Sequence, residues 1–221
     1  MNPIFPSILS TNFFNLQAKL SEFEKNRIDF IHLDIMDGHF VDNISFGPAL
    51  ARAIKGKFPF NLDVHLMVNN PAKMLSHFIE SGADWLSFHV EIDDDCGDLI
   101  GVIKKSGRRA GLVLNPDTPL ERVQPFLKMI DYILLMSVFP GFGGQKFITA
   151  TLERVRQLKK KLLSQQSPCL LQVDGGITLE NVSLLKEAGA DLFVIGTHLF
   201  NTDNIEEKIG QFLNRLQWSQ P

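Results

Sequence analysis

The strongest constraint on the fold is an eightfold alternation of short apolar runs with segments of helical periodicity. The runs are rich in β-branched residues and recur at roughly even spacing along the 221 residues. Between them, apolar side chains fall on one face of a helix, as Leu16, Leu20 and Phe23 do. The predicted strands are residues 4–9, 30–35, 62–68, 85–90, 110–114, 132–138, 170–173 and 192–195.

Eight strand-helix units without a linker favour a single-domain TIM (β/α)8 barrel that occupies residues 1–221. The 44% share of hydrophobic residues suits one full-sized core. An open doubly wound sheet would show the same alternation and is the alternative fold. In either case residues 80–84 and 187–191, which share the pattern Glu-x-Gly-Ala-Asp, predict two similar turns where helices end before strands.

Charge and cysteine content exclude several classes of protein. The formal net charge is -3 and there are no long like-charge runs, so we expect neither a nucleic acid nor a membrane as partner. The first residues lack the pattern of a secretory signal and no apolar stretch approaches 18 residues, which predicts a cytoplasmic enzyme. Cys96 and Cys169 form no CxxC pair, so we expect two ordinary thiols.

Polar residues with strand periodicity suggest a metal site at the carboxyl ends of the strands. His32 and Asp34 are two residues apart and should face the barrel interior, and Asp63 and His65 repeat this spacing on the next strand. Asp174 ends the seventh strand, across the mouth from the second and third. Imidazole and carboxylate are ordinary ligands of zinc, iron, manganese and cobalt. A single strand histidine would more often be a hydrogen-bonded core residue, but several such groups at one mouth favour a metal.

Glycine-rich segments follow the last three predicted strands and suggest a phosphate site. Glycines let backbone N–H groups converge on an anion, although each segment alone could be an ordinary turn. Three adjacent strands with such ends are typical of the phosphate-binding corner of many barrels. The segments are residues 140–145, 174–176 and 196–197.

Three methionines, Met36, Met67 and Met136, fall near the carboxyl ends of predicted strands. Each could simply fill irregular core space. Together they could form an apolar cushion that keeps water away from a reactive intermediate.

These segments resemble the ribulose-phosphate 3-epimerase family from about Pro6 to Phe200. The sequence differs from the usual family pattern at Asn12, Asp42 and Thr197, and Thr197 keeps the hydroxyl of the usual serine. The segments that carry the resemblance are residues 6–10, 32–38, 63–67, 136–138, 140–145 and 173–176.

The resemblance implies a site for one divalent metal and a sugar phosphate, and a homo-oligomer. The implied metal ligands are His32, Asp34, His65 and Asp174. Asp34 and Asp174 would also be the catalytic acid and base, and Ser7 and His65 would contact the substrate. The implied phosphate-binding residues are Gly141, Phe142, Gly143, Gly144, Gly175, Gly176, Gly196 and Thr197.

The implied reaction is the conversion of D-ribulose 5-phosphate to D-xylulose 5-phosphate in the pentose phosphate pathway. One of Asp34 and Asp174 would remove the C3 proton from one face, and the other would protonate the opposite face. A metal ion would stabilise the enediolate formed between these steps. The ligand types suit iron, zinc, manganese or cobalt and do not decide among them.

Three other functions are alternatives to this one. A D-allulose-6-phosphate 3-epimerase would use the same acids and metal. An orotidine monophosphate decarboxylase would need D-x-K-x-x-D, but residues 63–68 lack the lysine and the second aspartate. A barrel that only binds sugar phosphate would not need both acids and both histidines.

Overall fold

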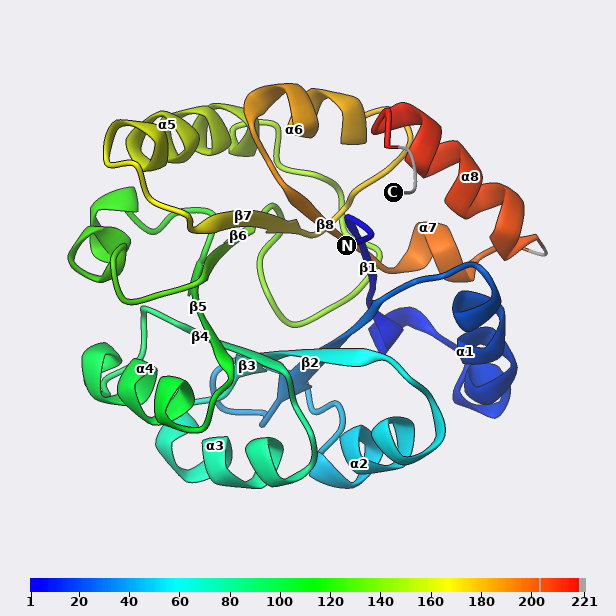
Figure 1. Ribbon diagram of the computed structural model, residues 1–221, viewed down its shortest axis with the longest axis horizontal. Helices are drawn as coiled ribbons and strands as arrows, with labels where there is room; N and C mark the ends of the chain where they lie inside the picture. The colour runs from blue at the N-terminus through cyan, green and yellow to red at the C-terminus, as the bar shows by residue number, and fades with distance from the viewer. Residues whose placement is uncertain (203, 219–221) are drawn as a thin grey trace.

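Eight parallel strands form one sheet in the computed structural model, which describes residues 1–202 and 204–218. A parallel bridge between Ser7 and His32 joins β1 to β2 and closes the sheet into a barrel. Figure 1 shows the helices as an outer ring around the strands. The predicted TIM barrel is confirmed, and the open doubly wound sheet is wrong. The strands are β1 (Ile4–Pro6), β2 (Phe30–Met36), β3 (Asn61–Met67), β4 (Trp85–His89), β5 (Arg109–Leu114), β6 (Tyr132–Met136), β7 (Leu170–Asp174) and β8 (Leu192–Ile195).

Helical segments connect successive strands, and all but one of these connections contain an α-helix. The exception lies between β5 and β6, where the 3-10 segment η3 (Leu120–Phe126) contains Pro125, which cannot donate a helical hydrogen bond. Two further 3-10 segments, η1 (Ile8–Ser10) and η2 (Phe13–Asn15), follow β1. The α-helices are α1 (Leu16–Lys25), α2 (Pro48–Lys57), α3 (Pro71–Glu80), α4 (Cys96–Lys105), α5 (Thr151–Ser164), α6 (Val182–Ala188), α7 (Thr197–Phe200) and α8 (Ile205–Arg215).

The first strand is shorter than predicted because Ser7 turns the chain. The prediction extended the strand to Leu9, but the Ser7 hydroxyl accepts a hydrogen bond from the Leu9 amide at 3.3 Å and caps η1. The sixth strand ends at Met136 and not at Val138, since the Ser137 hydroxyl donates to the carbonyls of Asp174 and Gly175. In both places a serine hydroxyl bonds to the backbone where the strand ends, and the serine amide still donates to a carbonyl of the neighbouring strand, Ile195 for Ser7 and Asp174 for Ser137.

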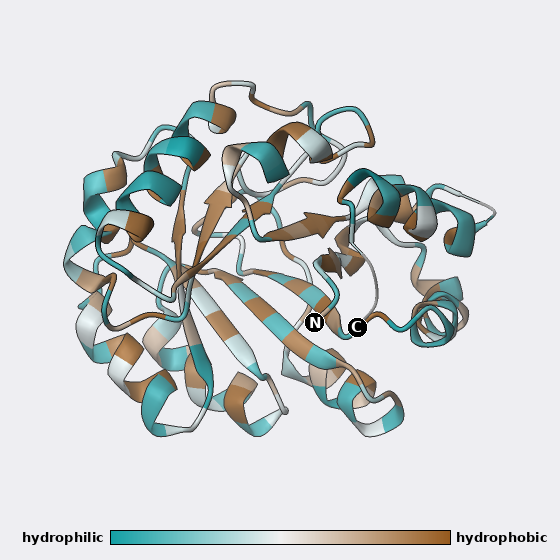
Figure 2. Cartoon of the chain, turned by 45° about the horizontal axis from the view of Figure 1, so that its top comes forward, coloured by the Kyte–Doolittle hydropathy of each residue, from teal (hydrophilic) through white to brown (hydrophobic). Residues whose placement is uncertain are grey.

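The amino end of the barrel is filled by aromatic side chains. Phe5 and Phe30 stack with their ring centroids 4.5 Å apart, and Trp85 packs against both. Tyr132 lies 4.8 Å from Trp85, centroid to centroid, and is fully buried. A second, larger apolar layer lies between the strands and the helices, and Figure 2 shows bands of hydrophobic residues along the helices. The barrel is therefore solid at its amino end, and any cavity must lie at its carboxyl end.

At this amino end, an aspartate just before an even-numbered strand repeatedly binds a lysine and the amide of a neighbouring strand. Asp84, before β4, accepts hydrogen bonds from the Lys55 ammonium and from the Leu62 amide of β3. Asp131 and Asp191, before β6 and β8, each accept from a lysine and a strand amide in the same way. The similar turns at residues 80–84 and 187–191 are confirmed: Gly82 and Gly189 follow helices with φ of 92° and 111°.

Both cysteines are free thiols, as predicted. Cys96 begins α4 and is half-buried, and Cys169 is buried just before β7. Among the described residues, no helix is both long enough and apolar enough to cross a membrane.

Candidate active site

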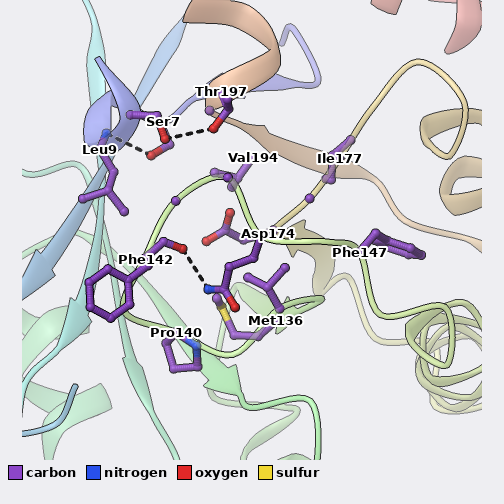
Figure 3. A pocket seen from close by; sticks show the side chains of 18 of the residues that line it. Ser7, Leu9, Met136, Pro140, Phe142, Phe147, Asp174, Ile177, Val194 and Thr197 are labelled. Atoms are coloured by element: carbon purple, nitrogen blue, oxygen red, sulfur yellow. Dashed lines mark hydrogen bonds between the residues drawn. The ribbon is translucent and has the colours of Figure 1, made fainter. Parts of the chain in front are cut away.

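A cavity of about 550 Å³ opens at the carboxyl ends of the strands. Residues of five strands, β2, β3, β6, β7 and β8, and of the loops at the carboxyl ends of the barrel line it, and in Figure 3 the Asp174 carboxylate points into it near Met136 and Val194. Ser7, which follows β1, and Asp34, on β2, line the same cavity and come from the N-terminal part of the chain. The parallel barrel thus brings residues that are far apart in the sequence to one site, as Ser7 and Asp174 are.

Four predicted metal ligands, His32, Asp34, His65 and Asp174, do converge. One ligand atom from each lies within 4.8 Å of those from all the others. Asp34 Oδ1 is 3.3 Å from both His32 Nε2 and His65 Nδ1, and Asp174 Oδ2 is 4.0 Å and 3.9 Å from these two nitrogens. Strand periodicity points the first three inward, and the end of β7 supplies the fourth.

The donor atoms fit a divalent cation. His32 Nε2 is buried and, within the described part of the chain, has no well-formed hydrogen bond, although two carboxylates lie within 4.0 Å. A buried polar atom in this state is costly unless another group satisfies it. Two imidazole nitrogens and two carboxylate oxygens are a common ligand set for first-row metals. The group could therefore hold one such ion.

Asp63 holds the His32 ring from behind. Its Oδ2 lies 2.8 Å from His32 Nδ1 and accepts a hydrogen bond from Gln172 Nε2 at 2.8 Å, and its Oδ1 accepts from the Tyr132 hydroxyl at 3.0 Å. The sequence suggested a carboxylate near an imidazole here. It did not reveal Tyr132 and Gln172, since a tyrosine and a glutamine at ordinary strand positions carry no recognisable motif.

The pKa values of the two acids of the site are displaced in opposite directions. Burial would raise the pKa of Asp34, but the adjacent His32 and His65 lower it well below its usual value. Burial and the negative charge of Asp34 raise the pKa of Asp174, whose side chain is only 13% exposed. These opposite displacements favour an ionised Asp34 beside a protonated Asp174.

The two histidines differ in the same way. Burial would lower the pKa of His32, but Asp34 and Asp63 outweigh it and raise that pKa well above its ordinary value. Burial lowers the pKa of His65 to about 4, although Asp34 opposes this. His65 is therefore neutral at physiological pH, which is the state that binds a metal, whereas His32 would lose its proton when an ion binds.

All the predicted phosphate-binding residues line the cavity: Gly141, Phe142, Gly143, Gly144, Gly175, Gly176, Gly196 and Thr197. Gly176 has φ of 61°, and a Cβ there would lie 2.7 Å from the Phe147 nitrogen. Only glycine fits such a close backbone approach. Amide side chains that the prediction left out shape this region: Asn43 donates to the Gly141 carbonyl and Asn181 to the Gly176 carbonyl.

Of the remaining predicted residues, the three methionines and Ser7 line the cavity and His65 does not. Met36, Met67 and Met136 are each less than 5% exposed and line the cavity, while their water-excluding role stays a prediction. Ser7 also lines the cavity and donates to Asp34 Oδ2 at 2.5 Å. His65 is fully buried and is not among the described residues that line the cavity, so its contact with substrate stays a prediction.

Comparison with known proteins agrees with this geometry. The model of the ribulose-phosphate 3 epimerase family matches residues 3–200. The chain belongs to this family. It is 41% identical over 208 residues to ribulose-phosphate 3-epimerase from Chlamydia pneumoniae, with 92% of this chain and 91% of that one covered. It is 39% identical to ribulose-phosphate 3-epimerase from Bacillus subtilis, with 96% and 98% covered. This epimerase-family chain is therefore an enzyme of the isomerase class.

More distant structures share the fold. 3-Hexulose-6-phosphate synthase from Salmonella typhimurium superposes with a TM-score of 0.72 at 14% identity, over 97% of this chain and 98% of that one. A tryptophan synthase α-subunit from Pyrococcus furiosus gives 0.70 at 16% identity, over 96% and 98%. At such low identity the likeness extends to the barrel alone.

Proposed function

We propose that the protein catalyses the reversible, metal-dependent epimerisation of D-ribulose 5-phosphate at C3 to give D-xylulose 5-phosphate. The observation that carries the proposal is the pair Asp34 and Asp174, which meet at one cavity with pKa values displaced in opposite directions. The names of the curated relatives support a ribulose phosphate as the substrate, and the place in the pentose phosphate pathway rests on the family resemblance.

The two carboxyl groups suit a proton transfer on opposite faces of C3. The ionised Asp34 removes the C3 proton and becomes neutral, and the protonated Asp174 delivers its proton to the other face and becomes ionised. The configuration at C3 is thereby inverted. The acids are left with exchanged protonation states, which are those required for the reverse reaction.

His32, Asp34, His65 and Asp174 would hold one divalent ion. When bound, the ion supplies positive charge that stabilises the enediolate oxygens. Iron, zinc, manganese and cobalt all suit these ligands. His32 and His65 orient Asp34 within the same cluster, and the Ser7 hydroxyl fixes its other oxygen.

The glycine-rich edge of the cavity would bind the phosphate through main-chain amides of residues 141–144, 175–176 and 196–197. The buried methionines would limit the access of water to the reacting carbon. Thr197 would contribute a hydroxyl, which now donates to Ser10 Oγ at 3.1 Å.

The replacement Asp174→Asn tests the two-acid mechanism. Because Asn cannot exchange a proton, kcat should fall by about 10²- to 10⁴-fold while KM changes little. Asp93→Asn, at an exposed position after β4, is the matched control and should leave both constants unchanged. Turnover near the wild-type rate in Asp174→Asn would remove the mechanism.

Substrate and metal need separate measurements. Kinetics on D-ribulose 5-phosphate and D-allulose 6-phosphate side by side should favour the pentulose, and the opposite preference would overturn the substrate assignment. Chelation should abolish activity, and iron, zinc, manganese or cobalt should restore it. Full activity of a thoroughly metal-free preparation would end the metal proposal.

Three further properties stand as proposals on the family resemblance and the sequence. They are a single catalytic domain over residues 1–221, assembly into a homo-oligomer and a cytoplasmic location. Size-exclusion chromatography with light scattering would decide the second.

A further inference from the structure

The loop between β6 and α5 carries the first glycine-rich segment of the cavity, but little of the usual support holds it. Its two ends are joined by the Ile148 amide, which donates to the Ser137 carbonyl at 2.8 Å. Between these ends, within the described part of the chain, residues 139–147 make no well-formed backbone–backbone hydrogen bond. Phe139 and Phe142 are 52% and 59% exposed, so burial of their rings does not anchor the loop. The shape of the loop therefore depends on other contacts.

Gln145 supplies two such contacts from within the loop. Its Nε2 donates to the Phe139 carbonyl at 2.6 Å and to the Phe142 carbonyl at 2.8 Å, and Figure 3 draws the second bond as a dashed line. Because carbonyl oxygens only accept, the nitrogen of the side-chain amide and not its oxygen faces them. Both N–H groups of the side chain are used, and they close the loop onto carbonyls six and three residues earlier in the chain.

A second side-chain amide holds the same loop from outside. Asn43, which follows β2, donates through Nδ2 to the Gly141 carbonyl at 2.7 Å. Three carbonyls of the loop, those of Phe139, Gly141 and Phe142, are thus bonded to two side-chain amides. Gln145 makes two of these three bonds, so the shape of the loop depends on Gln145 more than on Asn43.

These bonds leave backbone N–H groups of the loop available to a ligand. The peptide between Phe142 and Gly143 is trans, so the carbonyl of the first residue and the N–H of the second point in opposite directions. Since the Phe142 carbonyl faces Gln145, the Gly143 N–H points away from that side chain. Neither the Gly143 nor the Gly144 N–H has a hydrogen-bond acceptor within the described part of the chain, and both residues line the cavity. Unpaired backbone N–H groups at a cavity wall suit an anion.

We propose that Gln145 is a positioning residue that preorganises the loop for the phosphate group of the substrate. Its two hydrogen bonds hold the loop in shape before the ligand arrives, so phosphate binding does not have to overcome the entropy of an unordered loop. The proposal rests on the proposed function in one respect, the place of the phosphate at residues 141–144. It adds that the affinity of this site depends on a side chain that acts through the backbone of the loop.

The experiment compares the wild type with Gln145→Met. Methionine is an unbranched side chain of similar length without a donor, so both bonds are lost with little change of shape. The dissociation constant for inorganic phosphate and the KM for D-ribulose 5-phosphate should both rise by about 10-fold. The kcat should change by less than about twofold, because both hydrogen bonds of Gln145 go to loop carbonyls and not to the proposed acids.

Backbone 15N relaxation without ligand supplies a second readout. The order parameters of the Gly143 and Gly144 amides should be about 0.85 in the wild type and below about 0.6 in Gln145→Met. Gln157→Met is the matched control, since Gln157 on α5 is exposed and donates to Glu153 Oε1 at 3.2 Å. Its order parameters, phosphate affinity and KM should equal those of the wild type. Any unfolded fraction is visible in the same NMR spectra.

The outcomes separate the two proposals. If inorganic phosphate leaves the Gly143 and Gly144 amide signals of the wild type unshifted, the phosphate binds elsewhere, and the phosphate site of the proposed function is wrong together with the role of Gln145. If phosphate shifts these signals, but Gln145→Met keeps a rigid loop or the wild-type phosphate affinity, only the positioning role is overturned. A kcat that falls by about 10-fold or more at unchanged KM would also overturn it, because Gln145 would then act in the chemical step.

Discussion

Replacement of the only tyrosine by phenylalanine, Tyr132→Phe, probes the carboxylate network beneath the site. The ring is fully buried, and its hydroxyl donates to Asp63 Oδ1 at 3.0 Å. The other two partners of Asp63, His32 Nδ1 and Gln172 Nε2, both lie on Oδ2. Among the described hydrogen bonds, Oδ1 therefore depends on Tyr132 alone, and phenylalanine leaves this oxygen buried without a donor.

The expected cost follows from these contacts. A hydrogen bond to a buried charged group contributes about 1.5–3 kcal/mol, so the free energy of unfolding should fall by about 2 kcal/mol. For a chain of this length that lowers Tm by roughly 4–8 °C. Urea denaturation should show a lower midpoint with an unchanged m-value, because the fold and its buried surface stay the same.

The control removes a hydroxyl from the surface. Ser164→Ala deletes an exposed hydroxyl that donates to the Lys161 carbonyl, and should change the free energy of unfolding by less than about 0.5 kcal/mol. If Tyr132→Phe is no more destabilising than this control, Asp63 does not depend on the tyrosine and the account of the network is wrong.

Three further predictions concern single groups. Burial and the Asp63 charge raise the pKa of Tyr132 well above 10, so phenolate absorbance should stay absent in the folded protein at pH 10. The stability that the neutral, buried phenol contributes is complete below the pKa of the unfolded chain and is lost as pH rises above it. A native protein whose tyrosine titrates near pH 10 would contradict the burial. Burial raises the pKa of Cys169 to about 12, so a thiol reagent at mildly alkaline pH should leave this cysteine unmodified until the protein unfolds. Rapid labelling of Cys169 in the native state would show that the segment around it opens. Gly176→Ala would force a Cβ to within 2.7 Å of the Phe147 nitrogen, so it should destabilise the protein by about 1–3 kcal/mol and raise KM more than it lowers kcat; unchanged KM would place the phosphate elsewhere.

The geometry of the proposed metal site was predictable in part because strands have a period of two residues. His32 and Asp34 on β2, and His65 on β3, point inward for that reason alone. The carboxyl ends of parallel strands also meet at one end of a barrel, which places Asp174 near them. Spacing along one strand could not say that all four donor atoms come within 4.8 Å. That distance depends on how the strands tilt and stagger when the barrel closes.

The residues behind the site were less predictable. Tyr132 and Gln172 are 69 and 109 positions from Asp63. A buried polar side chain in a strand gives no sign of its partner until neighbouring strands are in register. Space matters as well, since a Cβ at Gly111 would lie 2.4 Å from the Tyr132 ring, and nothing in the sequence indicates that this glycine makes room for the tyrosine.

By itself the sequence determined the order of strands and helices, the inward direction of the polar strand residues and the glycines at the strand ends. These properties are local, because they follow from the hydrophobic period and from the backbone freedom of single residues. Only the tertiary structure decided which nitrogen of each histidine faces the cavity, which carboxyl group keeps its proton and which buried groups hold them. Those properties depend on distances of a few ångströms between distant parts of the chain, and electrostatic and hydrogen-bond energies change steeply over such distances.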